Sequence, residues 1–220
     1  MKLTKPEDKL IALAGIVAVF QRFLGEYLAG IWRNWLPMDL LWCTRWKAWS
    51  RAEKFRAPSW SWASIDGPIM RRYCRFDEGM HEALAAVVDV SVAYKDSHAS
   101  SLVTGAELHI MGKLALAGPR AGCESSYYGD DFRPFEFRDV SQCPPDERKV
   151  DVKFDDSRDE EDRSTGVCLP IKRNAPSNGI HGLALRKVEG QIFRRVGLFV
   201  RWRFTTFKFE RLPQTTVTII

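Results

Sequence analysis

Histidine and cysteine are the residue types in this chain that most often bind metals or act as nucleophiles. The four histidines lack the H-x-x-x-H and H-E-x-x-H spacing of helical zinc sites, and the five cysteines include no C-x-x-C pair. This spacing favours reduced thiols in an intracellular protein over a zinc ribbon or a disulfide framework. Sequence order leaves open a metal, Ser-His-Asp or Cys-His site assembled in the folded chain. The residues concerned are His81, His98, His109, His181, Cys43, Cys74, Cys123, Cys143 and Cys168.

Two further patterns resemble ligand-binding loops only loosely. Residues 155–166 are as acidic as a calcium loop, but Glu160 stands where such a loop needs glycine and Gly166 where it needs glutamate. The glycines between residues 105 and 118 are too scattered to cradle phosphate, and no G-x-S-x-G motif is present. We therefore expect a solvated charged loop here, and no cofactor or metal site.

Tryptophan and arginine are concentrated in residues 31–62. Such a mixture can stack nucleic-acid bases or line a ligand cage. The interpretation we favour is packing of the N-terminal segment onto the rest of the chain, with Arg45 or Arg51 lying over an indole. Asp66 and Gly67 follow directly, and an aspartate before glycine usually accepts from nearby backbone N–H groups in a turn rather than from a ligand.

Composition and charge limit the class of protein. With 220 residues, 45% hydrophobic and 28% charged, the chain is long enough for a real core. Residues 146–163 contain nine acidic and five basic residues, so this segment carries −4 and the remainder of the +5 chain +9. The basic residues form no tract and no nucleic-acid signature, so a nucleic-acid role is not favoured.

The apolar run 10–20 is too short for a bilayer and is preceded by Glu7 and Asp8, which predicts a cytoplasmic chain without a membrane segment.

Hydrophobic periodicity predicts an α+β fold. Apolar spacing predicts helices at residues 6–24 and 26–35 and a short segment at 40–42, and the first is apolar on so many sides that we expect it to be buried by more than one neighbour. Period-two alternation predicts a strand at 58–65, with Trp60 and Trp62 on one face as a core nucleus. The later strands are predicted at 85–94, 106–117 (one strand or a bent pair), 165–172, 183–188, 191–200 and 215–220.

The architecture that follows is two or three N-terminal helices packed on an antiparallel β domain, either a sandwich or an open barrel. Residues 1–55 form the helical segment and 56–220 the β domain, in one structural unit. Residues 144–164 are predicted to be a charged, flexible loop because they contain almost no apolar side chains.

Several sequence blocks occur in an order that resembles the region downstream of the HET domain in fungal heterokaryon incompatibility proteins. These blocks are D-K-L-I-A-L-A-G-I at 8–16, Y-L-A-G-I-W at 27–32, L-L-W at 40–42 and R-A-P-S-W-S-W-A-S at 56–64, with weaker matches at 168–171, 182–185 and 193–199. The resemblance covers nearly the whole chain. The residues that it marks as structural motif positions are Trp32, Trp42, Pro58, Trp60, Trp62, Asp66 and Gly67.

The resemblance implies a non-catalytic module. The HET domain itself carries an S-Y-x-W-G block and a W-T-L-Q-E-like block, and neither is in this sequence. That domain is thought to be related to TIR domains, some of which cleave NAD, so any such chemistry would belong to the missing part. The implied role is support or regulation of self/non-self recognition and cell death, with a protein or the HET domain as partner. Whether the chain is a fragment or a stand-alone module stays open.

The alternative hypothesis comes from a different class. The aromatic and basic residues would also suit a β domain that binds a small ligand or nucleic acid. Salt-sensitive binding of an oligonucleotide would favour this alternative over the protein-recognition module.

Overall fold

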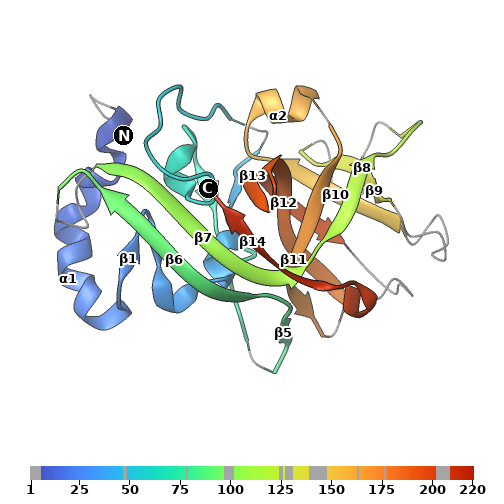
Figure 1. Ribbon diagram of the computed structural model, residues 1–220, viewed down its shortest axis with the longest axis horizontal. Helices are drawn as coiled ribbons and strands as arrows, with labels where there is room; N and C mark the ends of the chain where they lie inside the picture. The colour runs from blue at the N-terminus through green and yellow to red at the C-terminus, as the bar shows by residue number, and fades with distance from the viewer. Residues whose placement is uncertain are drawn as a thin grey trace.

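The computed structural model describes residues 6–46, 49–77, 79–96, 102–123, 126, 131–138, 148–162, 164–175, 177–201 and 209–220. Its secondary structure is mostly β, with one α-helix near the N-terminus, so the fold is α+β (Figure 1). Short 3-10 turns lie at Pro6–Lys9, Ile11–Leu13, Arg33–Trp35, Met38–Leu41, Trp62–Ser64 and Phe209–Arg211. In the part of the chain that is described, no helix is long and apolar enough to cross a bilayer.

Six antiparallel strands close into a barrel. Neighbouring strands follow the order β9, β8, β11, β12, β13 and β10, and β10 pairs with β9 again, which completes the ring. The barrel is therefore closed, where the sequence predicted a sandwich or an open barrel. The strands are β8 (Ala115–Pro119), β9 (Arg133–Phe137), β10 (Lys149–Phe154), β11 (Gly166–Asn174), β12 (Gly179–Glu189) and β13 (Ile192–Arg201).

A long ribbon extends from the barrel. It contains β6 (Ala86–Tyr94), β7 (Val103–Lys113) and β14 (Gln214–Ile219), and β14 joins β13 in parallel through two residue pairs. The strand β5 (His81–Ala83) pairs with β11. In Figure 1 this ribbon runs from the barrel towards α1 (Ala14–Leu24) at the opposite end of the long axis.

Alternate side chains of the barrel strands enter two separate cores. Cys168, Ala184 and Phe199 belong to the cluster that fills the barrel, whereas Leu169 and Leu183 belong to the cluster outside it. This is the period-two alternation of a strand buried on both faces. The outer core also contains Leu40, Leu41 and Trp42 of the N-terminal segment, together with Trp60.

Only one α-helix forms in the N-terminal segment, not two or three. Residues 26–35 form a small hairpin, β1 (Tyr27–Leu28) and β2 (Ile31–Trp32), followed by a 3-10 turn. Ala29 and Gly30 have φ of 46° and 106°, which ends any helix and makes a two-residue hairpin turn. The prediction of a second helix was wrong because the apolar spacing could not reveal this turn.

The expected strand at 58–65 is a turn followed by the 3-10 helix Trp62–Ser64. Ser61 Oγ accepts from the Ala63 N–H at 3.0 Å, and Ser64 Oγ donates to the Ser61 carbonyl at 2.7 Å. The alternating serines therefore satisfy local backbone groups and do not form a solvent-facing side of a strand. Trp60 is buried while Trp62 is only half-buried, so the two indoles do not share a face as predicted.

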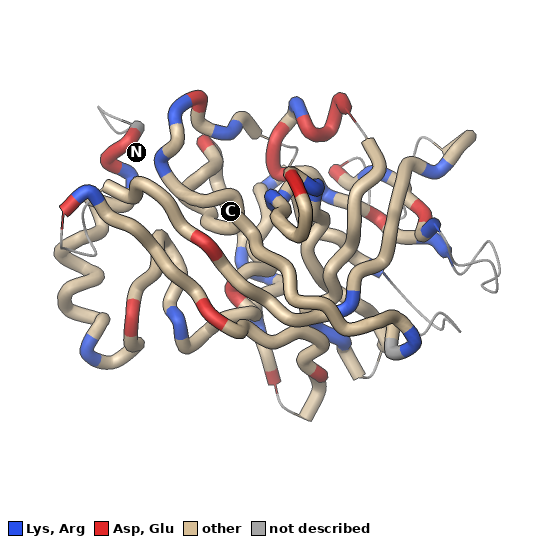
Figure 2. Tube along the Cα trace, in the orientation of Figure 1, with Lys and Arg blue, Asp and Glu red and all other residues tan. Residues whose placement is uncertain are grey.

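The described part of the predicted charged loop, residues 148–162, is also ordered secondary structure. It forms β10 and the short helix α2 (Ser157–Asp162), and the other residues of the prediction, apart from Ser164, lie outside the described residues. Val150, Val152 and Phe154 point into the barrel core. The prediction was wrong because the charges near α2 are paired: Arg186 donates to Asp159 at 2.9 Å, and Arg194 also binds this carboxylate. Elsewhere along the described residues, Lys and Arg are spread out without a continuous tract (Figure 2).

Other strand predictions are confirmed in outline. β6 matches residues 85–94, and β7 with β8 gives the bent-pair form of residues 106–117. β12 and β13 form the predicted hairpin, with Gly190 at φ 45° in its turn. The first predicted helix begins as two 3-10 turns and becomes α-helical at Ala14.

Candidate functional site

Two adjoining hollows lie on the N-terminal half of the molecule, and Asp39 and Arg71 line both of them. We call them the helix pocket, beside α1, and the loop pocket, beside residues 71–76; together they are the aromatic groove. Their volumes are about 380 Å³ and 730 Å³. The helix pocket is lined by Leu13, Ile16, Val17, Tyr27, Gly30, Trp32, Asp39, Trp42, Trp62, Ile69 and Arg71. The loop pocket is lined by Asn34, Trp35, Leu36, Pro37, Met38, Asp39, Arg71, Cys74, Arg75, Phe76 and Ala83.

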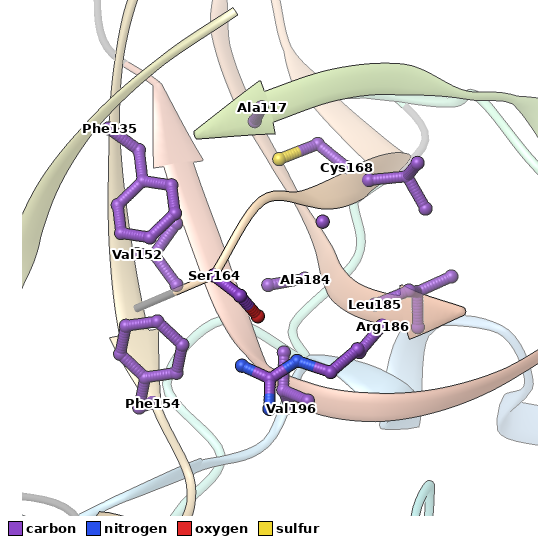
Figure 3. A pocket seen from close by; sticks show the side chains of 12 residues that line it. Ala117, Phe135, Val152, Phe154, Ser164, Cys168, Ala184, Leu185, Arg186 and Val196 are labelled. Carbon is purple, nitrogen blue, oxygen red and sulfur yellow. The ribbon is translucent and has the colours of Figure 1, made fainter. Parts of the chain in front are cut away.

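A pocket inside the barrel is much smaller. This pocket is walled by aromatic and aliphatic side chains, with Ser164 and Arg186 on one side (Figure 3). The cavity measures about 20 Å³. A space of this size holds about one water molecule. The barrel is therefore a packed support, and the aromatic groove is the better candidate for binding.

The hairpin turn that borders the helix pocket is held by the S-W-S-W block. Ser61 Oγ donates to the Ala29 carbonyl, and Trp62 Nε1 donates to the Gly30 carbonyl at 2.6 Å. A Cβ on Gly30 would lie only 2.9 Å from Trp62 Nε1, so glycine permits this close approach. These bonds connect two of the sequence blocks that carry the family resemblance and fix the Trp62 indole in the pocket wall.

An ion pair between Asp39 and Arg71 divides the groove. The Asp39 side chain is almost buried, while the Arg71 side chain is about half-exposed and its guanidinium lies 5.2 Å from the Trp35 ring centre. Burial raises the pKa of Asp39 above its usual value, and the hydrogen bond and charge of Arg71 offset only part of this increase. The groove thus combines apolar walls with the central Asp39 carboxylate and the accessible guanidiniums of Arg71 and Arg75.

Residues 71–76, which form one wall of the loop pocket, are fixed to β11 and β12. Lys172 Nζ donates to the carbonyls of Tyr73 and Arg75 at 2.5 and 2.6 Å. His181 lies beneath the same segment, with its ring centre 4.9 Å from that of Tyr73. Burial, followed by the charges of Lys172, His81 and Arg72, lowers the pKa of His181 to about 3.

Acid should therefore destabilise the protein through His181. In the unfolded chain a histidine binds its proton near pH 6.5, whereas folded His181 does so only near pH 3, so the unfolded state carries more protons between these values. The stabilising contribution is complete above about pH 6.5 and is lost as the pH falls towards 3, at up to about 1.4 kcal/mol per pH unit. Urea unfolding from about pH 7 to 4 measures this slope. His181→Gln should flatten it; equal slopes in wild type and His181→Gln would contradict the assignment.

The seven residues singled out from the sequence are divided between the groove and the core. Three tryptophans, Trp32, Trp42 and Trp62, line the helix pocket. Trp60 and Pro58 are buried and line neither hollow. The remaining two lie elsewhere in a turn: Asp66 is exposed and pairs with Arg56 at 2.6 Å, and a Cβ on Gly67 would clash with Trp49 at 2.5 Å.

The tryptophan and arginine mixture contributes to both packing and the groove. Arg45 lies over the Trp46 ring at 4.5 Å, as predicted. The guanidinium over Trp42, at 3.6 Å, comes instead from the distant Arg195. Sequence reasoning did not find Asp39, Arg71 or Phe76 as groove residues. Their only sequence signal was their position near the aromatic-rich segment.

The described histidines and cysteines form no metal-binding cluster with acidic residues in the ranges that the structure describes. Cys43, Cys74 and Cys168 are buried thiols, and burial raises the pKa of the first two to about 11 and that of Cys168 further. A thiol with a raised pKa stays protonated at neutral pH and is a poor nucleophile.

Comparison with known proteins does not identify a relative. No protein-family model matches the chain, no curated protein is similar to it, and no solved structure matches its fold.

Proposed function

We propose that this chain is a non-catalytic recognition module that binds a segment of a partner protein in the aromatic groove. The observation that carries the proposal is the pair of apolar hollows on either side of the Asp39–Arg71 ion pair. Each hollow can take an apolar side chain, and the ion pair between them offers a donor and an acceptor to a peptide backbone. Tryptophan and arginine are also the residue types that dominate the energetics of protein interfaces.

The biological setting proposed is that of the family resemblance. The chain would be the module downstream of a HET domain in a cytoplasmic fungal incompatibility protein, where it supports or regulates self/non-self recognition and cell death. The S-W-S-W and Y-L-A-G-I-W blocks support this proposal because they contact each other directly and build the wall of the groove. An in-frame HET block in the genomic sequence upstream of Met1 would support this setting. A chain that hydrolyses NAD, with turnover lost on Asp39→Asn, would contradict the non-catalytic part.

Removing groove side chains should abolish peptide binding. A phage-displayed library of random peptides of about 12 residues, selected on the wild-type chain, supplies the probes. Trp35→Ala and Arg71→Ala should each weaken the selected peptides at least about tenfold, because they remove an accessible indole and its stacked guanidinium. Fluorescence anisotropy with labelled peptides measures the affinities.

Trp46→Ala is the matched control for this experiment. Trp46 is also an exposed indole stacked by an arginine, at 4.5 Å from Arg45, but it lines neither hollow. Peptides that bind Trp46→Ala normally and Trp35→Ala weakly support the groove. Peptides that depend equally on both tryptophans, or on neither, would show that the aromatic groove is not the recognition site.

A second candidate is a small-ligand or nucleotide site in the loop pocket. The observation that favours it is the volume of about 730 Å³, with Trp35 and Phe76 next to Arg71 and Arg75. That volume lies within the range of ligand pockets, and aromatic and basic side chains together suit a base and its phosphate. Thermal shift against metabolites and oligonucleotides separates the candidates: a salt-sensitive shift that Arg75→Ala removes favours the second.

A further inference from the structure

The exposed face of α1 carries an apolar stripe, which we define as Ile16, Val19, Phe20 and Phe23. These side chains are 59%, 50%, 47% and 71% exposed. Their spacing of three and four residues places them on one helical face. The only charged residue of the helix is Arg22, whose guanidinium lies over the Phe23 ring. A contiguous apolar face of this kind marks an interaction surface.

The sequence predicted that this helix would be buried by more than one neighbour, and that prediction was wrong for the single chain. Val17 is the one buried residue of α1, and it faces the body of the molecule. The helix lies at the end of the long axis opposite the barrel (Figure 1), and little of its backbone tube is coloured as charged (Figure 2). Among the described residues, no second neighbour covers this face of the helix.

We propose that the apolar stripe packs against the same stripe of a second copy, with the two α1 helices antiparallel across a twofold axis. An axis midway between Val19 and Phe20 places Ile16 against the partner's Phe23 and Val19 against the partner's Phe20. Every contact then joins a β-branched aliphatic side chain with a phenylalanine. A large residue meets a smaller one at each position, which is the size matching that close packing requires.

The surroundings of the stripe agree with this arrangement. Gly15 and Ala18 are small residues beside it, and a Cβ added to Gly15 would meet nothing within 4 Å, so the helix surface is open there. The antiparallel pairing puts the two copies of Arg22 on opposite sides of the axis, which avoids contact between like charges. A parallel pairing would instead place Phe23 against Phe23 and Val19 against Val19, with poorer size matching.

The expected dimer is weak and reversible. Four side chains that are each about half-exposed supply on the order of a few hundred Å² per copy, compared with about 800 Å² per partner in a stable standard interface. We therefore expect a dissociation constant in the micromolar range. Because α1 lies at one end of the molecule, the dimer should be elongated, with the two barrels at its far ends.

Sedimentation velocity from about 1 to 300 µM, combined with small-angle X-ray scattering, tests the dimer. Wild type should pass from monomer to an elongated dimer over this range. Phe20→Glu and Phe23→Glu should each weaken dimerisation at least about tenfold, since a charge is placed in the apolar contact. Val88→Glu, at an equally exposed apolar residue on β6, is the control and should dimerise normally.

Exchanging residues across the proposed contact tests the register. The double variant Ile16→Phe/Phe23→Ile preserves an aliphatic–aromatic pair and should dimerise within about threefold of wild type, whereas Ile16→Phe alone crowds two phenylalanines and should weaken the dimer.

Three results would overturn the proposal: a wild-type monomer at about 300 µM, a compact dimer, or dimerisation unaffected by Phe20→Glu. A monomer would leave a different protein as the occupant of the stripe. Phe20 and Phe23 do not line the aromatic groove, whereas Ile16 lines its helix pocket. The Phe20→Glu and Phe23→Glu variants therefore test the dimer independently of the proposed peptide binding.

Discussion

Replacing Asp155 with alanine is expected to destabilise the protein by about 3–5 kcal/mol, because it leaves the buried charge of Arg195 without its carboxylate. Both side chains are 0% exposed, and the Arg195 Nε to Asp155 Oδ2 distance is 2.8 Å. Arg195 also donates to the Leu40 and Trp42 carbonyls and lies 3.6 Å from the Trp42 ring centre. Arg195, held by Asp155, therefore joins the barrel to the segment that carries the aromatic groove.

Urea unfolding of Asp155→Ala at neutral pH measures this loss. Glu26→Ala is the matched control, because it removes an exposed ion pair with Arg33 and should cost less than about 1 kcal/mol. A double variant with apolar residues at positions 155 and 195 should recover only part of the stability, since the Leu40 and Trp42 carbonyls would lose their donor. A loss below about 1 kcal/mol for Asp155→Ala would mean that Arg195 can reach water.

The strands that could be predicted from the sequence are those whose alternation matches their burial. The hairpin of β12 and β13 is the clearest example, since it is bounded by a glycine turn and alternates between the two cores. β10 has the same alternation at Val150, Val152 and Phe154, but the charges around it masked the pattern. Charged residues predict a loop only if they face water, and here distant arginines pair with them.

The groove was predictable by residue type but not by geometry. Three tryptophans in the helix pocket were recognised because aromatic side chains are informative wherever they occur. The Asp39–Arg71 pair was not, because the two residues are 32 positions apart and one sequence contains no sign of which acid meets which base. Hydrogen bonds between the hairpin turn and the S-W-S-W block are similarly long-range, and they override the local spacing that predicted a helix and a strand.

Trp60→Ala should cost about 3–5 kcal/mol, whereas Trp62→Ala should cost about half as much. Trp60 is 0% exposed within the outer core, and its carbonyl accepts from Trp42 Nε1 at 2.8 Å. Trp62 is half-buried between Lys9, 5.1 Å above its ring centre, and the Gly30 carbonyl that its indole binds. The smaller loss at Trp62 therefore combines one hydrogen bond with partial apolar burial.

Phenylalanine substitutions sharpen this comparison. Trp60 Nε1 is buried and has no hydrogen-bond partner among the described residues, so Trp60→Phe loses volume but no hydrogen bond and should recover at least half of the alanine loss. Trp62→Phe should keep most of the stability but release the Gly30 turn and weaken peptide binding in the groove. Chemical unfolding and anisotropy on the same four variants test both statements. Equal destabilisation by Trp60→Ala and Trp62→Ala would contradict the division between a core indole and a groove indole.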